Sequence, residues 1–270
     1  TRMLRHLTAV WAARHFLLAL VKLDLRLRYR RSVLGVGWSL LNPIAMTAVF
    51  TVVFSNLFGN DDPIGYAAYA LAGLAVWGFL RDAATLGSKA FLTNEVYIRQ
   101  SPMPYTVYTL RTVLGQAIHA CLAVLVVVTV QAFLKGDVGA LAGLVLALPG
   151  LLLALIAAWA VATIGAFVTA FFHDMSHILE VAAQLGFFLT PIMYRRSLFD
   201  SRGLGWVVDI NPANLYISLI RDPILAGAPT TEGLAHLGQL YLPAGALTAV
   251  LVALAVGTVG WLQKKVIFHL

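Results

Sequence analysis

Four arginines near the N-terminus form the densest group of side chains suited to binding an anion. They lie in the run RLRYRR and are Arg26, Arg28, Arg30 and Arg31. A guanidinium group forms paired hydrogen bonds with phosphate oxygens, so these residues could capture the diphosphate of a lipid-linked molecule. The same charges would also anchor the chain to anionic lipid headgroups. The two roles are compatible, and both place the run at a membrane surface.

The sequence contains none of the short motifs that mark common catalytic centres. A GxxxxGK[ST] loop, an HExxH motif, a CxxC motif and a paired-aspartate phosphotransferase motif are all missing. His173 and His177 have the i, i+4 spacing of a metal site, but only Asp174 and Glu180 lie near them. We interpret the histidines as a polar turn that touches a partner. We therefore predict no catalytic residue, no metal site and no cofactor in this chain.

The elements that must position the arginines belong to an integral membrane protein. Hydrophobic residues make up 60% of the 270, and charged residues only 11%, compared with about 25% in soluble domains. This composition excludes a cytosolic enzyme, a secreted disulfide scaffold and a disordered chain. The single cysteine, Cys121, forms no internal disulfide. The formal charge of +7 indicates membrane topology rather than nucleic-acid binding.

Six apolar stretches approach the length of about 20 residues that a membrane-spanning helix needs. The predicted spans are Val36–Phe58, Gly65–Leu86, Thr112–Leu134, Gly143–Phe172, Ile178–Tyr194 and Tyr241–Leu262. The fourth is too long for one perpendicular crossing, so it should tilt or begin near Pro149-Gly150. The fifth is short and polar at Glu180 and Gln184, as expected beside protein or a water-filled cavity. We predict one all-α membrane domain over residues 1–270.

The distribution of Lys and Arg predicts the orientation of this domain. Of the 19 basic residues, 14 fall on the side of the two termini and 5 on the other side. Cytoplasmic segments carry the excess of positive charge, so both termini are predicted to be cytoplasmic. An even number of spans agrees with that placement.

Two cytoplasmic segments have helical character of their own. Within residues 1–34, apolar and basic positions alternate with helical periodicity, which predicts an amphipathic helix in the membrane interface. Residues 87–105 have helical potential through Arg99, and Pro102 and Pro104 then end the helix. A short rigid helix at this place is suited to docking a partner, although an ordinary solvated loop has the same composition.

Residues 195–240 are external by this topology and too long for a simple turn. Asn211-Pro212 is typical of an N-cap followed by the first helical position, and Asp222-Pro223 should stop that helix. A second helix around 201–208 is plausible. Two short re-entrant helices would cap a cavity from outside.

An aromatic series marks the first predicted span. Trp38 is followed by Phe50, Phe54 and Phe58, the last three with the i, i+4, i+8 spacing of one helical face. These side chains could pack against lipid and other helices, or they could form a stacking surface for sugar rings in a channel. The chain therefore has features of a conduit but no motor of its own, and an external motor is the economical inference.

Three parts of the sequence resemble ABC-2 type permeases that export bacterial cell-surface polysaccharides. They are LVKLDLRLRYRRSVLGVGWSLLNPIAMTAVFTVVFSNLFG (20–59), NEVYIRQSPMPYTVY (94–108), and FFLTPIMY (187–194) together with INPANLYISLIRDPIL (210–225). The RYRRSVLGVGWSLLNP run is the most specific of them.

The resemblance implies an ATP-driven transporter of the inner membrane. Such permeases form homodimers with two copies of a separate ATPase subunit, which binds ATP and Mg²⁺, and they move glycans linked to undecaprenyl diphosphate. A wall teichoic acid or capsular polysaccharide exporter would be the same machine with another polymer. An ion-coupled carrier or a drug or small-lipid efflux permease is the alternative from another class, and a membrane enzyme fits least well.

The resemblance also assigns residues to roles. The N-terminal helix would lie near the carrier headgroup, and the first and fifth spans would line the channel and its lateral gate. The residues that would dock into the ATPase are Asn94, Glu95, Tyr97, Arg99 and Gln100. The channel aromatics would be Trp38, Phe50, Phe54, Phe58, Phe187 and Tyr194. The external gate would include Pro191, Asn211, Pro212 and Tyr216.

Overall fold

The computed structural model describes residues 8–28, 30, 32, 35, 37–58, 62–100, 103–134, 136, 139–227 and 230–268. Within these ranges all regular secondary structure is helical, which confirms the all-α prediction. Five helices are long and apolar enough to cross a membrane, as expected of a multi-pass membrane protein. They are α3 (Gly37–Phe58), α4 (Pro63–Ser88), α7 (Thr106–Leu134), α8 (Gly139–Phe171) and α13 (Thr231–Leu262).

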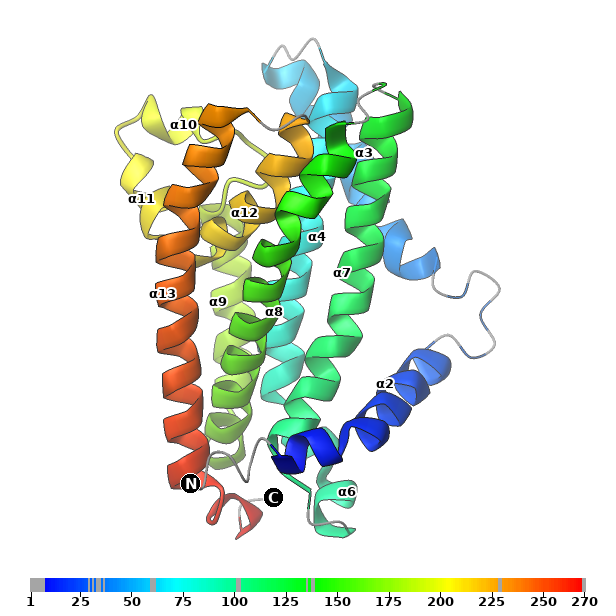
Figure 1. Cartoon of the computed structure of the whole chain (residues 1–270), viewed down its shortest axis with the longest axis vertical. Helices are drawn as coiled ribbons and strands as arrows, with labels where there is room; N and C mark the ends of the chain where they lie inside the picture. The colour runs from blue at the N-terminus through cyan, green and yellow to red at the C-terminus, as the bar shows by residue number, and fades with distance from the viewer. Residues whose placement is uncertain are drawn as a thin grey trace.

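The shorter helices lie mainly at the two ends of this bundle. Figure 1 shows α2, α6 and η1 near one end, and α10, α11 and α12 near the other. The predicted cytoplasmic segments and the predicted external segment are thus on opposite sides. The short helices are α2 (Arg14–Arg28), α5 (Ala90–Thr93), α6 (Glu95–Gln100), α9 (Met175–Leu189), α10 (Ser197–Asp200), α11 (Gly205–Ile210), α12 (Pro212–Ala226) and η1 (Val266–Phe268).

Helix α8 is continuous, and the predicted start near Pro149-Gly150 is wrong. Its 33 residues extend over about 50 Å at 1.5 Å per residue. Pro149 lacks an amide hydrogen and therefore weakens the hydrogen bonding of the preceding turn. The hydroxyl of Tyr241 donates to the carbonyl of Leu146 in that turn, 3.0 Å away.

Helix α9 is shorter than the predicted fifth span. It ends at Leu189, so the prediction of a helix through Tyr194 is wrong. Pro191 disfavours the helical conformation in the residue before it, and Thr190 is extended, with φ −103° and ψ 132°. The 15 residues of α9 cover only about 22 Å.

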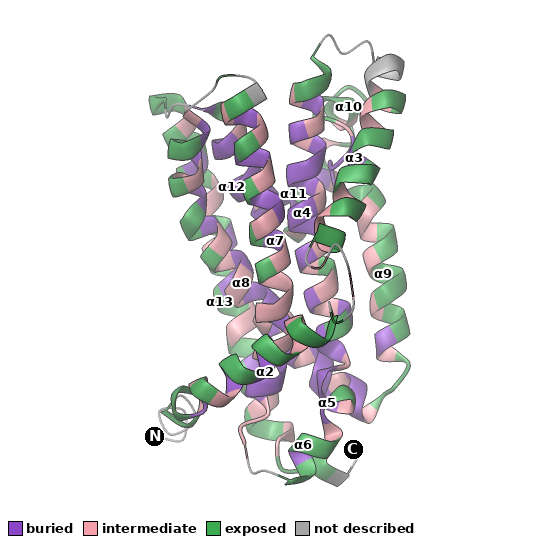
Figure 2. Cartoon of the chain, turned by 90° about the vertical axis from the view of Figure 1, so that its right-hand side faces the viewer, coloured by how far each residue is buried: buried purple, intermediate pink, exposed green. Residues whose placement is uncertain are grey.

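Small residues make the interior of the bundle. Helix α8 packs against α4, α7, α12 and α13, and its buried positions are mainly alanine and glycine, for example Gly143, Ala154 and Ala162. Small side chains let membrane helices approach closely and gain dispersion energy. Figure 2 shows the opposite pattern on α3 and α9, which are mostly exposed. Among the residues described, each of these two helices has a single buried position, Thr47 on α3 and Ser176 on α9.

Candidate functional site

A cavity of about 590 Å³ lies between α3, α4, α7 and α9, with Arg28 of α2 at its edge. Amide and acidic side chains from all four helices line it. These residues are Asn42, Asp82, Gln116, Glu180 and Gln184. Polar groups among membrane helices are costly, so their convergence on one space makes this cavity the candidate functional site. Amide and carboxylate groups at such a site suit a ligand that is rich in hydroxyl groups.

Aromatic rings complete the lining of this cavity. Trp38 and Phe187, two predicted channel aromatics, both face it, together with Trp77 of α4. The Trp77 and Phe187 rings are 6.2 Å apart between centroids. Gly186 permits this approach, because a Cβ there would lie 2.9 Å from the Trp77 ring. The combination of flat apolar rings and hydrogen-bonding groups is suited to sugar rings, which have both kinds of surface.

The other predicted channel aromatics lie elsewhere. Helix α3 contributes residues to the cavity only as far as Met46, and Phe50 and Phe54 lie one and two turns further along. Their rings pack edge to face with centroids 5.9 Å apart. Tyr194 packs on Phe199, with ring centroids 5.2 Å apart. The side chain of Phe58 lies outside the described part of the chain.

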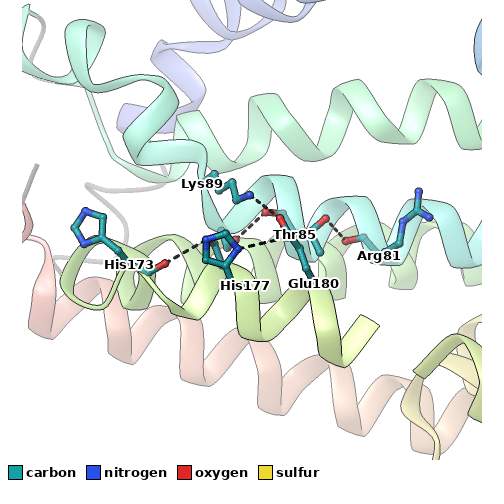
Figure 3. Close-up of polar contacts among 8 residues, drawn as sticks. Arg81, Thr85, Lys89, His173, His177 and Glu180 are labelled. Carbon is teal, nitrogen blue, oxygen red and sulfur yellow. Dashed lines mark hydrogen bonds and ion pairs between the residues drawn. The ribbon is translucent and has the colours of Figure 1, made fainter. Parts of the chain in front are cut away.

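A charged cluster joins α9 to the end of α4, as Figure 3 shows. One member, Glu180, also lines the cavity. Lys89 Nζ lies 2.6 Å from Glu180 Oε1, and His177 Nδ1 lies 3.6 Å from Glu180 Oε2. His177 therefore contacts a carboxylate through its ring. For His173, it is the backbone carbonyl that accepts a hydrogen bond, from the Ser176 hydroxyl. Among the residues that the structure describes, no group of three or more His, Cys, Asp or Glu side chains could hold a metal ion.

The predicted headgroup arginines have different environments. Arg28 lines the cavity, Arg26 and Arg30 are exposed, and Arg31 lies outside the described residues. Helix α2 holds this group against the bundle through buried Leu17 and Val21, which pack on α7. The structure thus places Arg28 between an exposed basic surface and the polar cavity.

The predicted coupling residues are organised by a residue that sequence reasoning missed. Asn94 is buried between α5 and α6, and its amide donates to the Ala90 carbonyl at 2.7 Å. Its Oδ1 accepts a hydrogen bond from Arg111 Nη1 at 2.5 Å. Arg111 also pairs with Asp24 of α2. The one available signal was Asp24 itself, an acid within a strongly basic segment.

The remaining coupling residues lie on α6, near the end of the bundle. Glu95 and Arg99 form an ion pair one turn apart, with Arg99 Nε 2.8 Å from Glu95 Oε1. Gln100 ends the helix and is exposed. The Arg111 guanidinium lies over the ring of Tyr97, with the Arg111 Cζ atom 5.8 Å from the centroid of the ring. Helix α6 therefore presents a charged, exposed surface on a fixed support.

One predicted gate residue, Pro191, lies in the segment that follows α9, residues 190–194, which we call the gate segment. The Pro191 carbonyl accepts hydrogen bonds from Tyr69 at 3.1 Å and from Arg221 at 2.8 Å. The Met193 carbonyl accepts one from Tyr66 at 2.5 Å. These side chains come from α4 and α12, so the segment is fastened to two helices. Sequence reasoning missed all three donors, since nothing in their local pattern points to a segment that lies 30 residues from Arg221 and more than 100 residues from Tyr66 and Tyr69.

Helix α12 begins where the sequence predicted. The side chain of Asn211 accepts a hydrogen bond from the Ala213 amide at 3.0 Å, and Pro212 is the first helical residue. The Asn211 amide also donates to Thr190 Oγ1 at 2.8 Å, which ties the cap to the gate segment. Tyr216 is buried, and its hydroxyl lies 2.9 Å from Thr248 Oγ1 of α13.

The predicted end of α12 at Asp222-Pro223 is wrong. The helix continues through Pro223 to Ala226 and stops at Gly227, which has a φ of 72°. Glycine adopts this left-handed conformation without a steric penalty, and it commonly ends helices. Close packing of α8 against Pro223, at Gly143, supports the last turn.

The upstream external helix is divided in two. The predicted helix around 201–208 overlaps only α11, because α10 ends at Asp200 and a turn at Gly203, with a φ of 69°, separates the two. Arg196 Nη1 lies 2.7 Å from Asp209 Oδ1 and links the start of α10 to α11. The hydrogen bond to the Asp209 carboxylate raises the pKa of Arg196 above its ordinary value.

Comparisons with known proteins show what this chain is similar to in sequence. The family model described as "ABC-2 type transporter" matches residues 15–225, from α2 to α12. Two proteins of Klebsiella pneumoniae, each named O-antigen export system permease protein RfbA, are similar to this chain. One is 26% identical over 235 residues, covering 87% of this chain and 88% of the relative. The other is 24% identical over 239 residues, covering 88% and 90%.

A third relative extends this similarity to another organism. The O-antigen export system permease protein RfbA of Myxococcus xanthus is 25% identical over 212 residues, which cover 78% of this chain and 80% of the relative. The residues that the family model matches include the lining of the cavity, the α2 arginines and the external segment as far as residue 225.

Proposed function

This chain belongs to the ABC-2 type transporter family, and we propose that it is the permease subunit of an ATP-driven exporter of undecaprenyl-diphosphate-linked, O-antigen-like polysaccharide. The observation that carries the proposal is the cavity between α3 and α9, with its amide, acidic and aromatic lining and with Arg28 at its edge. The names of the three similar proteins support the choice of polymer.

The proposed transporter is a homodimer with two ATPase subunits in the bacterial inner membrane, with both termini of this chain in the cytoplasm. Helix α9 and the gate segment that follows it form the sixth crossing, and α10 to α12 form the outer gate. The partner subunits bind ATP and Mg²⁺. Their closure moves α5 and α6, and the long rigid helices carry this motion to α3 and α9.

Within this scheme the substrate is held at two places. The diphosphate binds to Arg26, Arg28 and Arg30, whose guanidinium groups pair with phosphate oxygens. The first sugars enter the cavity, where Gln116 and Gln184 hydrogen-bond to hydroxyl groups and Trp38 and Phe187 contact the ring faces. Weak contacts of this kind hold the polymer and still let it move.

Reconstituted transport tests the proposal. Vesicles containing this chain, its ATPase subunit and ATP should move undecaprenyl-diphosphate-linked O-polysaccharide across the membrane, measured by accessibility of the glycan to an impermeant lectin. Vesicles with this chain alone should not. ATP-independent transport by the chain alone would contradict the proposal, and transport restricted to a teichoic or capsular polymer would reassign the cargo.

Removing the headgroup arginines should impair export. We expect Arg26→Gln, Arg28→Gln and Arg30→Gln together to lower export at least about tenfold, because each charged hydrogen bond contributes about 1.5 kcal/mol or more. Lys264→Gln, a change of one exposed cation near α13, should leave export unchanged. Unimpaired export by the triple variant, at equal membrane insertion, would rule out the headgroup role.

Filling the cavity should block the glycan while leaving the helices intact. Ala183 of α9 lines the cavity, so Ala183→Trp places an indole in the space proposed for the sugar. We expect a several-fold loss of export without loss of folded protein. Ala182→Trp, one position away and exposed, is the matched control. Equal export by the two variants would show that the glycan does not use this cavity.

A further inference from the structure

Arg111 of α7 contacts three other parts of the chain at once. Its Nε lies 2.6 Å from Asp24 Oδ2 and its Nη2 pairs with Asp24 Oδ1, so the guanidinium and carboxylate form a two-fold contact. Its Nη1 donates to Asn94 between α5 and α6 at 2.5 Å. Its charge also lies over the ring of Tyr97 on α6.

The exposure of the partners is unequal. The Arg111 side chain is only 11% exposed, whereas the Asp24 side chain is 41% exposed. A nearly buried guanidinium needs its partners, since an unpaired buried charge carries a large desolvation cost. The paired contact is also geometrically specific. Asp24 is therefore the accessible member, and a change there must alter how Arg111 holds Asn94 and Tyr97.

The geometry joins two regions with different proposed roles. Helix α2 rests on α7 through an apolar cluster that includes Val21 and Val107, and the Asp24–Arg111 pair is its charged attachment. Figure 2 shows α2 crossing the bundle close to α5 and α6. Arg111 thus contacts both the helix proposed to bind the headgroup and the helices proposed to meet the ATPase.

The headgroup would bind close to the Asp24–Arg111 pair. Asp24 and Arg28 are four residues apart on one helix, so their side chains are neighbours on the same face. Arg28 lines the cavity. A diphosphate held by Arg28 therefore places negative charge within one helical turn of the Asp24 carboxylate, where both anions compete for Arg111.

We propose that Arg111 is a substrate-sensing relay, through which an anionic diphosphate headgroup at α2 releases a restraint on the ATPase-docking helices α5 and α6. Without the headgroup, Asp24 holds Arg111, and Arg111 holds Asn94 and Tyr97. When the headgroup arrives, Arg111 turns toward it, and α5 and α6 become free to follow the ATPase. This inference rests on the proposed function and adds a regulatory role for two residues outside the proposed site.

The test uses the permease–ATPase complex in lipid nanodiscs, with ATP hydrolysis measured with and without undecaprenyl-diphosphate-linked glycan. In the wild type, ATP hydrolysis should rise with the glycan lipid. In Asp24→Asn, Arg111 loses its anionic partner, so the basal rate should rise by about fivefold or more, as expected for a typical coupling energy. The stimulation ratio should then fall toward one. A merely structural defect would lower the basal rate instead.

Two further variants and two lipids distinguish the relay from a general loss of structure. Asp24→Glu keeps the carboxylate and should retain the stimulation. Lys22→Gln changes an exposed charge on the same helix and should behave like the wild type. Undecaprenyl diphosphate without glycan should stimulate the wild-type complex, because the headgroup is the signal, whereas undecaprenol should not.

The outcomes distinguish the two proposals. If the wild-type complex neither transports the glycan lipid nor responds to it, the proposed function fails. If the wild type transports but Asp24→Asn keeps the wild-type ratio, or loses basal activity, the relay is wrong. The relay is also wrong if the wild-type complex transports the glycan lipid but undecaprenyl diphosphate does not raise its rate of ATP hydrolysis. This outcome needs no variant.

Discussion

Arg221→Met is expected to abolish most export and to loosen the external gate segment. Arg221 is 5% exposed, donates to the Pro191 carbonyl, and lies 4.0 Å from the centroid of the Tyr69 ring. Methionine removes the charge and keeps most of the length of the side chain. The variant loses a charged hydrogen bond and a desolvated cation–π contact, together roughly 2 kcal/mol or more.

The loss acts on a segment that is also held by hydrogen bonds from Tyr66, Tyr69 and Asn211. A change of about 2 kcal/mol shifts the equilibrium between the attached and the detached state of the gate segment about 30-fold. Tyr69 still donates to Pro191 and Tyr194, so the segment is loosened rather than unfolded. Export needs a gate that closes between movements of the polymer. A gate that stays open would let the exported part of the polymer slip back.

Cysteine labelling measures this effect directly. Met193 is buried and lies in the gate segment, so Met193→Cys in a Cys121→Ala background reports its exposure to an impermeant maleimide. Adding Arg221→Met should raise the labelling rate at least about tenfold. Arg202→Met, which changes an exposed arginine on the same side, is the control. Unchanged labelling and export would show that Arg221 does not fasten the segment.

Gly143→Ala is expected to destabilise the whole bundle. A Cβ at this position would lie 2.1 Å from the Pro223 carbonyl oxygen, 2.7 Å from its carbon and 2.9 Å from Ile224 Cα. All three atoms are backbone, so no side chain can rotate away. Helix α12 must shift from α8, and overpacking of this kind costs about 3 kcal/mol.

A second glycine provides a matched control for this substitution. At Gly245 of α13 an added Cβ would have no other atom within 4 Å, so Gly245→Ala adds the same methyl group in open space. Thermal unfolding of the purified protein, followed by size-exclusion chromatography, should show a clearly lower midpoint for Gly143→Ala. For Gly245→Ala it should be equal or slightly higher, because alanine favours the helix. Equal midpoints would mean that α8 and α12 are not tightly packed there.

Both predictions concern α12, and they show why this short helix matters. It packs on α8 through the contact at Gly143 and holds the gate segment through Arg221. A shift of α12 would therefore also move Arg221. We expect Gly143→Ala to raise labelling at Met193→Cys as well, in the fraction of protein that remains folded.

The sequence alone determined the elements that depend on local pattern. Apolar stretches of spanning length predicted the five long helices, because burial in lipid requires a continuous apolar surface and internally satisfied hydrogen bonds. Asn211 and Pro212 predicted the start of α12, since capping involves neighbouring residues only. Proline was less informative: Pro191 follows the end of α9, whereas α8 and α12 continue through Pro149 and Pro223.

Only the tertiary structure decided which side chains meet. The Asp24–Arg111 pair joins residues 87 positions apart, and the Tyr69–Pro191 contact joins residues 122 positions apart. The cavity likewise takes its lining from five helices. Hydropathy and periodicity describe one helix at a time, while the rotation and depth at which helices pack depend on the shapes of both partners. The sequence therefore indicated which types of side chain are candidates for a function, and the packing of the helices determined which partners they contact.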